Sequence, residues 1–305
     1  MADDELRIVS LIPSGTEIVA ALGLADRLVG RSHECDFPPG VERLPACTRP
    51  AFETGGASRD IDDRVRALLR EALTIYELDT DTLEQLRPTH IVTQDQCAVC
   101  AVDLAEVERA VAALTTREAR IVSHQPAVLA DVFDDVERTG EALGVDGAPV
   151  ADALRGRIDA IESKSSGLPR KRVACIEWCE PLMVAGNWVP EMVRLAGGED
   201  TLGVAGKHSP TIPWEALAAA DADAIVFMPC GYGLGRTRED AEMLAARPAW
   251  RDLRAARAGE VYVTDGNQFF NRPGPRLVES IEMLAEILHP ESFSFGHQGP
   301  AWERL

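Results

Sequence analysis

Thiol and imidazole side chains are concentrated in three short segments of the first half of the chain. Cys35 lies in the stretch Ser-His-Glu-Cys-Asp at 32–36, Cys97 and Cys100 form one Cys-x-x-Cys pair, and His124 ends a short apolar run. Thiolate and imidazole are the ligands that a soft metal such as zinc prefers. The sequence therefore predicts a metal site made of Cys35, Cys97, Cys100 and His124.

Two other interpretations of the Cys-x-x-Cys pair stay open. A single pair with no second Cys-x-x-Cys is weak evidence for zinc, and free cysteines lining a polar loop are slightly favoured over a metal site. A redox pair is the third alternative, because thiols close to a helix start can have a lowered pKa. Asp103 is expected to begin the next helix beyond the pair, which weakens the redox interpretation.

Polar and aromatic side chains that follow predicted strands form a second group of candidates. Ligands of open parallel sheets bind outside the carboxyl ends of the strands. Trp178 follows a strand directly and is expected to contact a ligand, whereas Trp214 begins an ordinary helix and is expected to pack in the core. The residues predicted to bind a ligand are Pro13, Ser14, Arg31, His33, Glu34, Gln94, Trp178, Trp188, Lys207, His208, Tyr232 and Asn267.

The elements that must position these residues alternate between short apolar runs and helical patterns. This alternation is typical of an α/β fold with mostly parallel sheets. Strands are expected at 7–11, 28–30, 90–93, 120–123, 172–176, 224–227 and 260–264. Ser14 and Asp81, each followed three residues later by Glu, are expected to cap the helices that they begin.

The alternation pauses between residues 126 and 166, where the pattern is helical and is broken once, at 144–149. Its second part is predicted to be one long helix. We therefore predict two Rossmann-like α/β lobes with mostly parallel sheets, joined by a single long linker helix. The expected boundaries are 1–147 for the N-terminal lobe, 148–166 for the linker and 167–305 for the C-terminal lobe.

Composition excludes several classes of protein. The chain has 50 acidic and 31 basic residues and a formal net charge of -19, so binding to nucleic acid is disfavoured. No apolar run is long enough to be a transmembrane segment. The acidic start lacks the features of a secretory signal, and seven cysteines at irregular spacing are no secreted disulfide framework. The protein is expected to be cytoplasmic as the sequence stands, and extracytoplasmic if a signal was left out.

A series of segments also carries a resemblance to a known family. These are Ile8–Glu17, Ala21–Gly23, Leu28–Gly30, Leu86–Val92, Pro181–Gly186, Val193–Gly198, Ala224–Phe227 and Arg276–Leu288. In this order they are similar to the cobalamin- and siderophore-binding class (class III) of ABC-importer substrate-binding proteins, although His90 stands where Asp is usual. The stretches at 32–36 and 93–100 resemble its vitamin-B12-binding-protein-like subgroup.

The resemblance implies a ligand-binding protein and not an enzyme. It implies a rigid linker helix and a cleft between lobes that holds cobalamin, a related corrinoid, or a similar large cofactor or metal chelate. It also implies an ABC transporter permease as the partner, which such proteins contact through one exposed Glu per lobe. Glu53 and Glu199 lie in plausible loops for that contact.

A second hypothesis is a metal- or thiol-dependent cytoplasmic enzyme, or a metal-binding protein, that uses the loops rich in His and Cys. A shared fold does not fix function, so the fold alone allows it. The sequence has no Ser-nucleophile elbow, no Walker-type loop and no Gly-x-Gly-x-x-Gly after a strand. No catalytic residue is therefore predicted.

Overall fold

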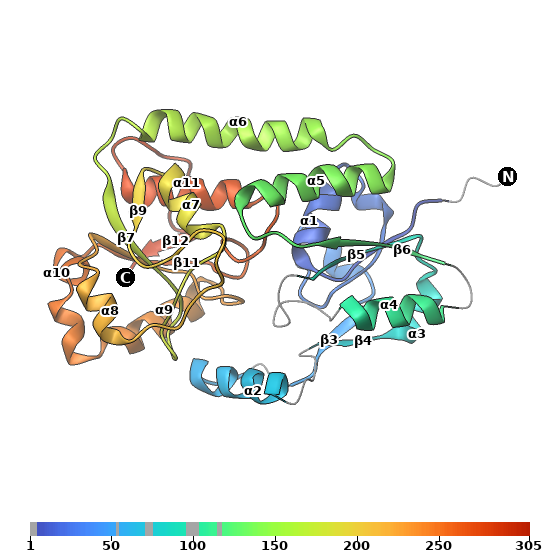
Figure 1. Cartoon of the computed structure of the whole chain (residues 1–305), viewed down its shortest axis with the longest axis horizontal. Coiled ribbons are helices and arrows are strands. Elements are labelled where there is room, and N and C mark those ends of the chain that lie inside the picture. Colours follow the sequence, from blue (N-terminus) through green and yellow to red (C-terminus); the bar gives the residue numbers. More distant parts are fainter. Residues whose placement is uncertain (1–4, 53–54, 71–75, 96–103, 115–117) are drawn as a thin grey trace. The chain divides into compact units, whose positions relative to one another are not determined.

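The computed structural model describes residues 5–52, 55–70, 76–95, 104–114 and 118–305 (Figure 1). Within them the chain divides into two compact units. Unit 1 comprises the described residues of Met1–Pro126 together with Ala130–Asp152, and unit 2 comprises Ala127–Leu129 together with Ala153–Leu305. None of the helices in the described ranges has the length and apolar character that a membrane span requires.

Unit 1 is built around a four-stranded parallel sheet with the order β2-β1-β5-β6. The chain runs from β1 to β2 on one side and later returns to β5 on the other side of β1, so the strand order reverses between β1 and β5. The elements are β1 (Ile8–Ser10), α1 (Pro13–Ala21), η1 (Ala25–Arg27), β2 (Leu28–Arg31), η2 (Val41–Arg43), β3 (Thr48–Pro50), α2 (Ser58–Arg70), β4 (Tyr76–Leu78), α3 (Thr80–Leu86), β5 (His90–Gln94), α4 (Leu104–Ala113), β6 (Arg120–His124) and α5 (Leu129–Leu143).

Both faces of this sheet are covered, and alternate strand residues serve the two faces. Ile8 and Val92 pack in a cluster with Val19 of α1, while Val9 and Ile91 pack in a second cluster that includes residues of α3 and α4. All four strand residues are fully buried. The predicted α/β class with a mostly parallel sheet is confirmed.

Two helix starts differ from the sequence-based prediction. Helix α1 begins at Pro13 with Ile12 as its N-cap and no side-chain cap, so Ser14 lies inside the first turn rather than capping it. Proline is favoured at a first helical position because its missing N–H would have no partner there. Helix α3 is capped by Asp79, whose carboxylate accepts a hydrogen bond from Thr82 N at 3.0 Å, two residues before the predicted Asp81.

Strands β3 and β4 form a two-stranded antiparallel ribbon that the sequence pattern did not indicate. Each has only three residues, and Thr48 faces Leu78 while Pro50 faces Tyr76. Such short strands carry too little alternation to be recognised. The ribbon brings Thr48 and Tyr76 beside the loop that follows β2.

Unit 2 contains a sheet with the order β12-β11-β10-β7-β8, and β9 also pairs with β7. Strands β9, β7, β10 and β11 are parallel, whereas β8 and β12 run antiparallel to their neighbours. The elements are α6 (Ala148–Ser165, which starts in unit 1), β7 (Lys171–Trp178), β8 (Met183–Val184), α7 (Val189–Leu195), β9 (Gly198–Asp200), α8 (Trp214–Ala219), β10 (Ala224–Phe227), α9 (Leu234–Ala245), η3 (Pro248–Asp252), α10 (Arg254–Ala258), β11 (Val261–Thr264), α11 (Leu277–Leu288) and β12 (Trp302–Arg304).

The C-terminal segment of unit 2 is held by hydrogen bonds to the buried carboxylate of Glu286. Glu286 of α11 accepts hydrogen bonds from the backbone N–H groups of Phe295, Gly296 and His297, and from Nε1 of Trp302 at 2.8 Å. A buried carboxylate requires several donors, and this one has four. Its contacts hold the chain in place before it pairs with β11 as the edge strand β12.

Helices α5 and α6 are separated at 144–147, within the predicted break. The turn is tight, since a Cβ on Gly147 would lie 2.6 Å from the carbonyl oxygen of Val136. The boundary between the two units falls inside α6, between Asp152 and Ala153. The assignment of 148–166 as a rigid linker between lobes 1–147 and 167–305 stays a prediction.

Candidate functional site

An aromatic pair marks the carboxyl edge of the sheet in unit 2. Trp178 ends β7 and Tyr232 follows the adjacent strand β10, and their ring centroids are 5.0 Å apart at an interplanar angle of 43°. Trp178 is held in position by its Nε1, which donates to the carbonyl oxygen of Glu180 at 3.0 Å. Both rings are only half-buried, so the pair offers apolar ring surface at the edge where such sheets bind ligands.

The loop after β11 supports this pair from its neighbouring strand. Asn267 N donates to the carbonyl oxygen of Tyr232 at 3.0 Å, which ties the β10 and β11 loops together. The guanidinium of Arg236 lies over the Tyr232 ring at 5.0 Å. Tyr232 and Asn267, two predicted ligand residues, are therefore brought together with Trp178, and Arg236 joins them without having been predicted.

Two largely buried arginines stand behind this edge. Arg272 donates to Oδ1 of Asn267 at 3.1 Å, and Arg276 donates to Oε1 of Gln268 at the same distance. Arg276 also lies over the Phe269 ring at 5.2 Å. These arginines hold the amide side chains of the loop in fixed orientations, a role that the sequence pattern did not indicate.

The prediction that Trp188 contacts a ligand is corrected by its position. Trp188 is 4 % exposed and its Nε1 donates to the carbonyl oxygen of Phe270 at 2.6 Å, so it packs inside unit 2. Lys207 and His208 are exposed, as a polar loop allows. The backbone of this loop is confined, because the carbonyl oxygen of Lys207 accepts from Asn187 N and lies 2.3 Å from where a Cβ on Gly186 would be.

In unit 1, the loop after β2 joins the β3 strand through a hydroxyl network. Thr48 Oγ1 accepts a hydrogen bond from His33 N at 3.0 Å, lies 2.7 Å from His33 Nδ1, and donates to Ser32 Oγ at 3.0 Å. Ser32 and Thr48 are buried, whereas the His33 ring is half-buried. Burial lowers the pKa of His33 below its ordinary value, against the raising effect of the Glu34 carboxylate.

Glu34 and Tyr76 complete this cluster. The Tyr76 hydroxyl donates to Glu34 Oε1 at 2.7 Å, and the Tyr76 ring meets His33 edge-on with centroids 5.0 Å apart. Arg31, also a predicted ligand residue, uses Nη1 to donate to the carbonyl oxygens of Ser32 and His33. Arg31 therefore shapes the loop that presents His33 and Glu34.

The remaining unit 1 candidates lie where the strand order reverses, at the ends of β1 and β5. Pro13 and Ser14 open α1, and Gln94 ends β5; all three are buried. The hydroxyls of Ser14 and Thr93 are fully buried and make no hydrogen bond within the described part of the chain. Cys97 and Cys100, which come next, lie outside the described residues.

The predicted grouping of Cys35 with His124 has to be corrected. Cys35 follows β2 and His124 ends β6, and these strands are the opposite edges of the sheet. Cys35 is buried among apolar side chains, where it accepts from Thr16 Oγ1 at 3.0 Å. His124 is 1 % exposed, its Nε2 lies 2.8 Å from Thr139 Oγ1, and burial lowers its pKa to about 3.

Within the described ranges no group of three or more His, Cys, Asp or Glu side chains is arranged to hold a metal ion. A zinc site is therefore not supported there. The residues that sequence analysis missed, chiefly Thr48, Tyr76 and Arg236, come from the unpredicted ribbon and from the first turn of a helix.

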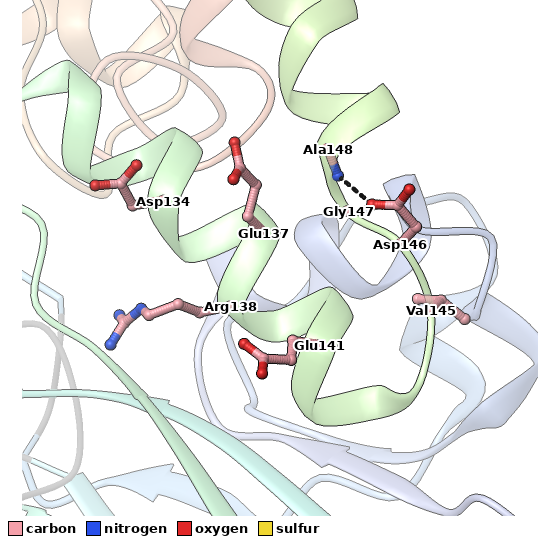
Figure 2. A pocket seen from close by; sticks show the side chains of 8 residues that line it. All are labelled: Asp134, Glu137, Arg138, Glu141, Val145, Asp146, Gly147 and Ala148. Carbon is pink, nitrogen blue, oxygen red and sulfur yellow. Dashed lines mark hydrogen bonds between the residues drawn. The ribbon is translucent and has the colours of Figure 1, made fainter.

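A pocket elsewhere in unit 1 lies beside α5 and the turn into α6 (Figure 2). It is lined by Asp134, Glu137, Arg138, Glu141, Val145, Asp146, Gly147 and Ala148. One lining contact is local, since Asp146 Oδ1 accepts a hydrogen bond from Ala148 N at 3.0 Å where α6 begins. None of the predicted ligand residues is among its lining residues, and the pocket follows a helix rather than a strand.

Two α/β units, each with polar or aromatic side chains at the carboxyl edge of a parallel sheet, form the arrangement of a ligand-binding protein. The family model described as "Periplasmic binding protein" matches residues 8–268. The chain belongs to the periplasmic binding protein family. The resemblance to the cobalamin- and siderophore-binding class is thereby confirmed.

The chain is similar to binding proteins of known sequence or structure. The chain is 24% identical over 298 residues to the "Uncharacterized ABC transporter substrate-binding lipoprotein YvrC" of Bacillus subtilis, covering 94% of this chain and 81% of that protein. It is 23% identical over 288 residues to the "Vitamin B12-binding protein" of Vibrio vulnificus, and the match covers 92% of this chain and 89% of that protein. The structure of the apo "Periplasmic heme-binding protein RhuT" of Roseiflexus sp. RS-1 matches this one with a TM-score of 0.69 and 20% sequence identity. The match covers 94% of this chain and 99% of that chain.

Members of this family are solute-binding proteins. The alternative of a metal- or thiol-dependent enzyme is therefore not supported, and the prediction of a non-enzymatic protein agrees with the family.

Proposed function

We propose that this chain is the substrate-binding protein of an ABC importer and that its ligand is a corrinoid of the cobalamin type. The observation that carries the proposal is the similarity to a vitamin B12-binding protein across 92% of the chain. The family and the lipoprotein relative favour a place outside the cytoplasm, the second of the two locations considered from the sequence.

The edge of unit 2 supports a ligand with a large flat face. The half-buried Trp178 ring is held by its hydrogen bond to the carbonyl oxygen of Glu180, and the Tyr232 ring packs against Trp178 and Arg236, so little side-chain entropy remains to be lost on binding. Ring surface of this kind favours contact with the apolar face of a conjugated macrocycle. Asn267 adds amide groups beside the rings for the polar rim of such a ligand.

The carboxyl edge of the unit 1 sheet offers polar groups for a ligand. His33 and Glu34 follow β2, and Gln94 ends β5 at the point where the strand order reverses. Ligand sites in proteins combine an apolar surface with a small number of fixed polar groups. Lys207 and His208 are retained as exposed candidates for the ligand's polar substituents.

A permease is the proposed macromolecular partner. Glu199 is exposed on β9 and remains a candidate for the contact in unit 2. Glu53, the candidate in unit 1, lies outside the described residues.

Titration calorimetry with cyanocobalamin tests the proposed ligand. Binding with one ligand per chain and a micromolar or lower dissociation constant is expected, which corresponds to about -8 kcal/mol. Absence of heat at high micromolar cyanocobalamin, with the protein shown to be folded by circular dichroism, would contradict the corrinoid assignment. Binding of hemin in place of cyanocobalamin would keep the importer function and replace the ligand.

A further inference from the structure

The last segment of unit 2 is hydrogen-bonded to the loop that supports the aromatic pair. Asp265 follows β11, and its backbone N–H donates to the carbonyl oxygen of Ala301 at 2.9 Å. The Asp265 carboxylate accepts from Asn267 N at 3.0 Å and from Gln268 N at 2.8 Å. Since Asn267 N also donates to the carbonyl oxygen of Tyr232, Asp265 connects the C-terminal segment with the carboxyl edge of the unit 2 sheet.

The same segment is attached to α11 by two carboxylates that lie one helical turn apart. Glu286 accepts from the backbone N–H groups of residues 295–297. Glu282 accepts from His297 Nε2 at 2.8 Å and from Arg157 Nη2 at 2.7 Å. The carbonyl oxygen of His297 accepts from the backbone N–H of Ala301 at 2.9 Å, so the attachment of His297 also positions Ala301.

The bond between His297 and Glu282 changes its charge state near neutral pH. A carboxylate can only accept, so His297 Nε2 carries the proton of this bond whether the ring is neutral or charged. The hydrogen bond to Glu282 raises the pKa of His297, burial opposes this rise, and the surrounding carboxylates add to it. When the ring loses its charge, a bond between opposite charges becomes a weaker bond from a neutral donor. The charged groups around the ring are Glu279, Glu282 and Glu286 of α11, Arg157 of α6 across Glu282, and Arg276 beside Glu279.

We propose that residues 295–302 brace the ligand-binding loop after β11, and that the ion pair between His297 and Glu282 weakens this brace as the pH rises. In the charged state the segment is held on α11, and Ala301 is in position to accept from Asp265. When His297 is neutral, local opening of the segment requires less free energy, and each opening removes the bond that holds Asp265. The inference rests on the proposed function, because it assigns a pH-dependent regulation to the same ligand site.

Hydrogen exchange of backbone amides tests the brace without a ligand. In the wild type, protection of amides 267–269 and 295–297, corrected for the intrinsic exchange rate at each pH, is expected to fall about two- to five-fold between pH 6 and pH 8. His297→Gln keeps a neutral donor, so its protection at pH 6 should equal that of the wild type at pH 8 and should change little with pH. A role of His297 in packing alone would lower protection equally at both pH values and would overturn the proposed regulation.

Two further variants sharpen this measurement. Glu282→Gln removes the charge and keeps an oxygen that accepts from Arg157, so it is expected to abolish the pH dependence as His297→Gln does. The double variant should show no further change, and additive effects of the two substitutions would overturn the role of the ion pair. His90→Gln is the matched control, since His90 begins β5 in unit 1 and its replacement should leave the pH dependence of amides 267–269 as in the wild type.

Titration calorimetry with cyanocobalamin measures the consequence for the ligand site. A loop that is less well held has to be ordered on binding, which lowers affinity. The affinity of the wild type is therefore expected to be about two- to five-fold lower at pH 8 than at pH 6, and that of His297→Gln should change less between these pH values.

The outcomes separate this inference from the proposed function. If loop protection and affinity depend on pH equally in the wild type and in His297→Gln, the inference is overturned while cyanocobalamin binding stands. If protection changes at 295–297 and not at 267–269, the segment does not brace the loop, and the inference is again overturned. If the wild type binds no cyanocobalamin but exchange follows the expected pattern, the corrinoid assignment fails and the brace is supported.

Discussion

The carboxyl edge of the sheet in unit 1 and the corresponding edge in unit 2 use different chemistry. In unit 1, hydroxyl, imidazole and carboxylate groups are joined through side-chain hydrogen bonds, as between Tyr76 and Glu34 or between Thr48 and Ser32. In unit 2, the edge consists of the rings of Trp178 and Tyr232 and a loop whose backbone is closely packed. The unit 1 edge offers directional hydrogen-bond donors and acceptors, and the unit 2 edge offers apolar ring surface.

This difference predicts that substitutions at the two edges have different effects on ligand binding. Aromatic surface contributes affinity in proportion to the area that it covers, whereas directional groups contribute specificity because a mispaired buried polar group is costly. We therefore expect changes in unit 2 to reduce affinity for many flat ligands, and changes in unit 1 to affect some ligands and not others.

The largest effect is expected from Gly266→Ala in unit 2. A Cβ on Gly266 would lie 2.2 Å from the carbonyl oxygen of Pro229, a backbone atom that cannot turn away. The free energy of unfolding should fall by about 3 kcal/mol, measured by urea denaturation. Gly235→Ala is the control, since its Cβ would meet nothing within 4 Å and α9 favours Ala.

In unit 1 the comparable change, Gly15→Ala, should lower the free energy of unfolding by a smaller amount. Its Cβ would lie 2.7 Å from Cγ1 of Val92, a side-chain atom, and Ala is better than Gly in α1 by up to about 1 kcal/mol. If Gly15→Ala and Gly266→Ala lowered the free energy of unfolding equally, this would contradict the distinction between the two edges. That distinction is that side chains pack against Gly15 in unit 1 and backbone atoms pack against Gly266 in unit 2.

The second effect concerns pH and the buried His124 of unit 1. Burial lowers its pKa to about 3, so the folded protein keeps it neutral while the unfolded chain binds a proton below pH 6.5. Stability is therefore lost as the pH falls. Between pH 7 and pH 5 this group should remove about 2 kcal/mol, and His124→Gln should show a correspondingly flatter decline in urea denaturation.

The Gln variant keeps a group that can hydrogen-bond to Thr139, so its stability at pH 7 provides the reference. An identical pH dependence in wild type and His124→Gln would show that His124 titrates normally.

The third effect is on affinity. Trp178→Ala removes the larger ring of the unit 2 pair and is expected to weaken cyanocobalamin binding about 10-fold, equivalent to about 1.4 kcal/mol. Trp178→Phe keeps a ring and should weaken it less. Calorimetry measures both, and Trp214→Phe serves as a control because Trp214 packs against the core of unit 2 through Trp250. Unchanged affinity in Trp178→Ala would show that the aromatic pair of unit 2 does not contact the ligand.

The smallest effect is a pH dependence of the opposite sign in unit 2. The hydrogen bond to Glu282 raises the pKa of His297, so the stability it contributes is present below pH 6.5 and is lost as the pH rises through the folded-state pKa. The pair is partly exposed, so the change is expected to be below about 1 kcal/mol. Between pH 6 and pH 8, the free energy of unfolding of His297→Gln, measured by urea denaturation, should fall less than that of the wild type. A larger fall in the variant would contradict this prediction.

Sequence patterns predicted the main elements of both units because those elements are long or buried enough to carry a period. The strand at 224–227 has the predicted bounds, a helix begins at Trp214 as predicted, and the break before α6 lies within the predicted interval. The strands β3, β4, β8, β9 and β12 were not predicted, because two or three residues contain no measurable alternation. Strand β1 is equally short and was predicted because it lies in the apolar run from Ile8 to Ile12.

The site was predicted less well than the fold because neighbouring loops depend on strand order. Trp178, Tyr232 and Asn267 were placed correctly at one edge, since their strands are adjacent. Cys35 and His124 were grouped wrongly, because nothing in the sequence indicates that β2 and β6 are opposite edges. The Thr48 and Tyr76 contacts depend on a ribbon that closes through long-range pairing, which local patterns do not report.

The C-terminal strand β12 covers the edge of β11. It is three residues long and runs antiparallel along β11, whose four residues are apolar or β-branched and fully buried. An exposed strand of that composition is a template for pairing with another molecule. Truncation before Trp302 is expected to leave β11 as an open edge and therefore to promote aggregation.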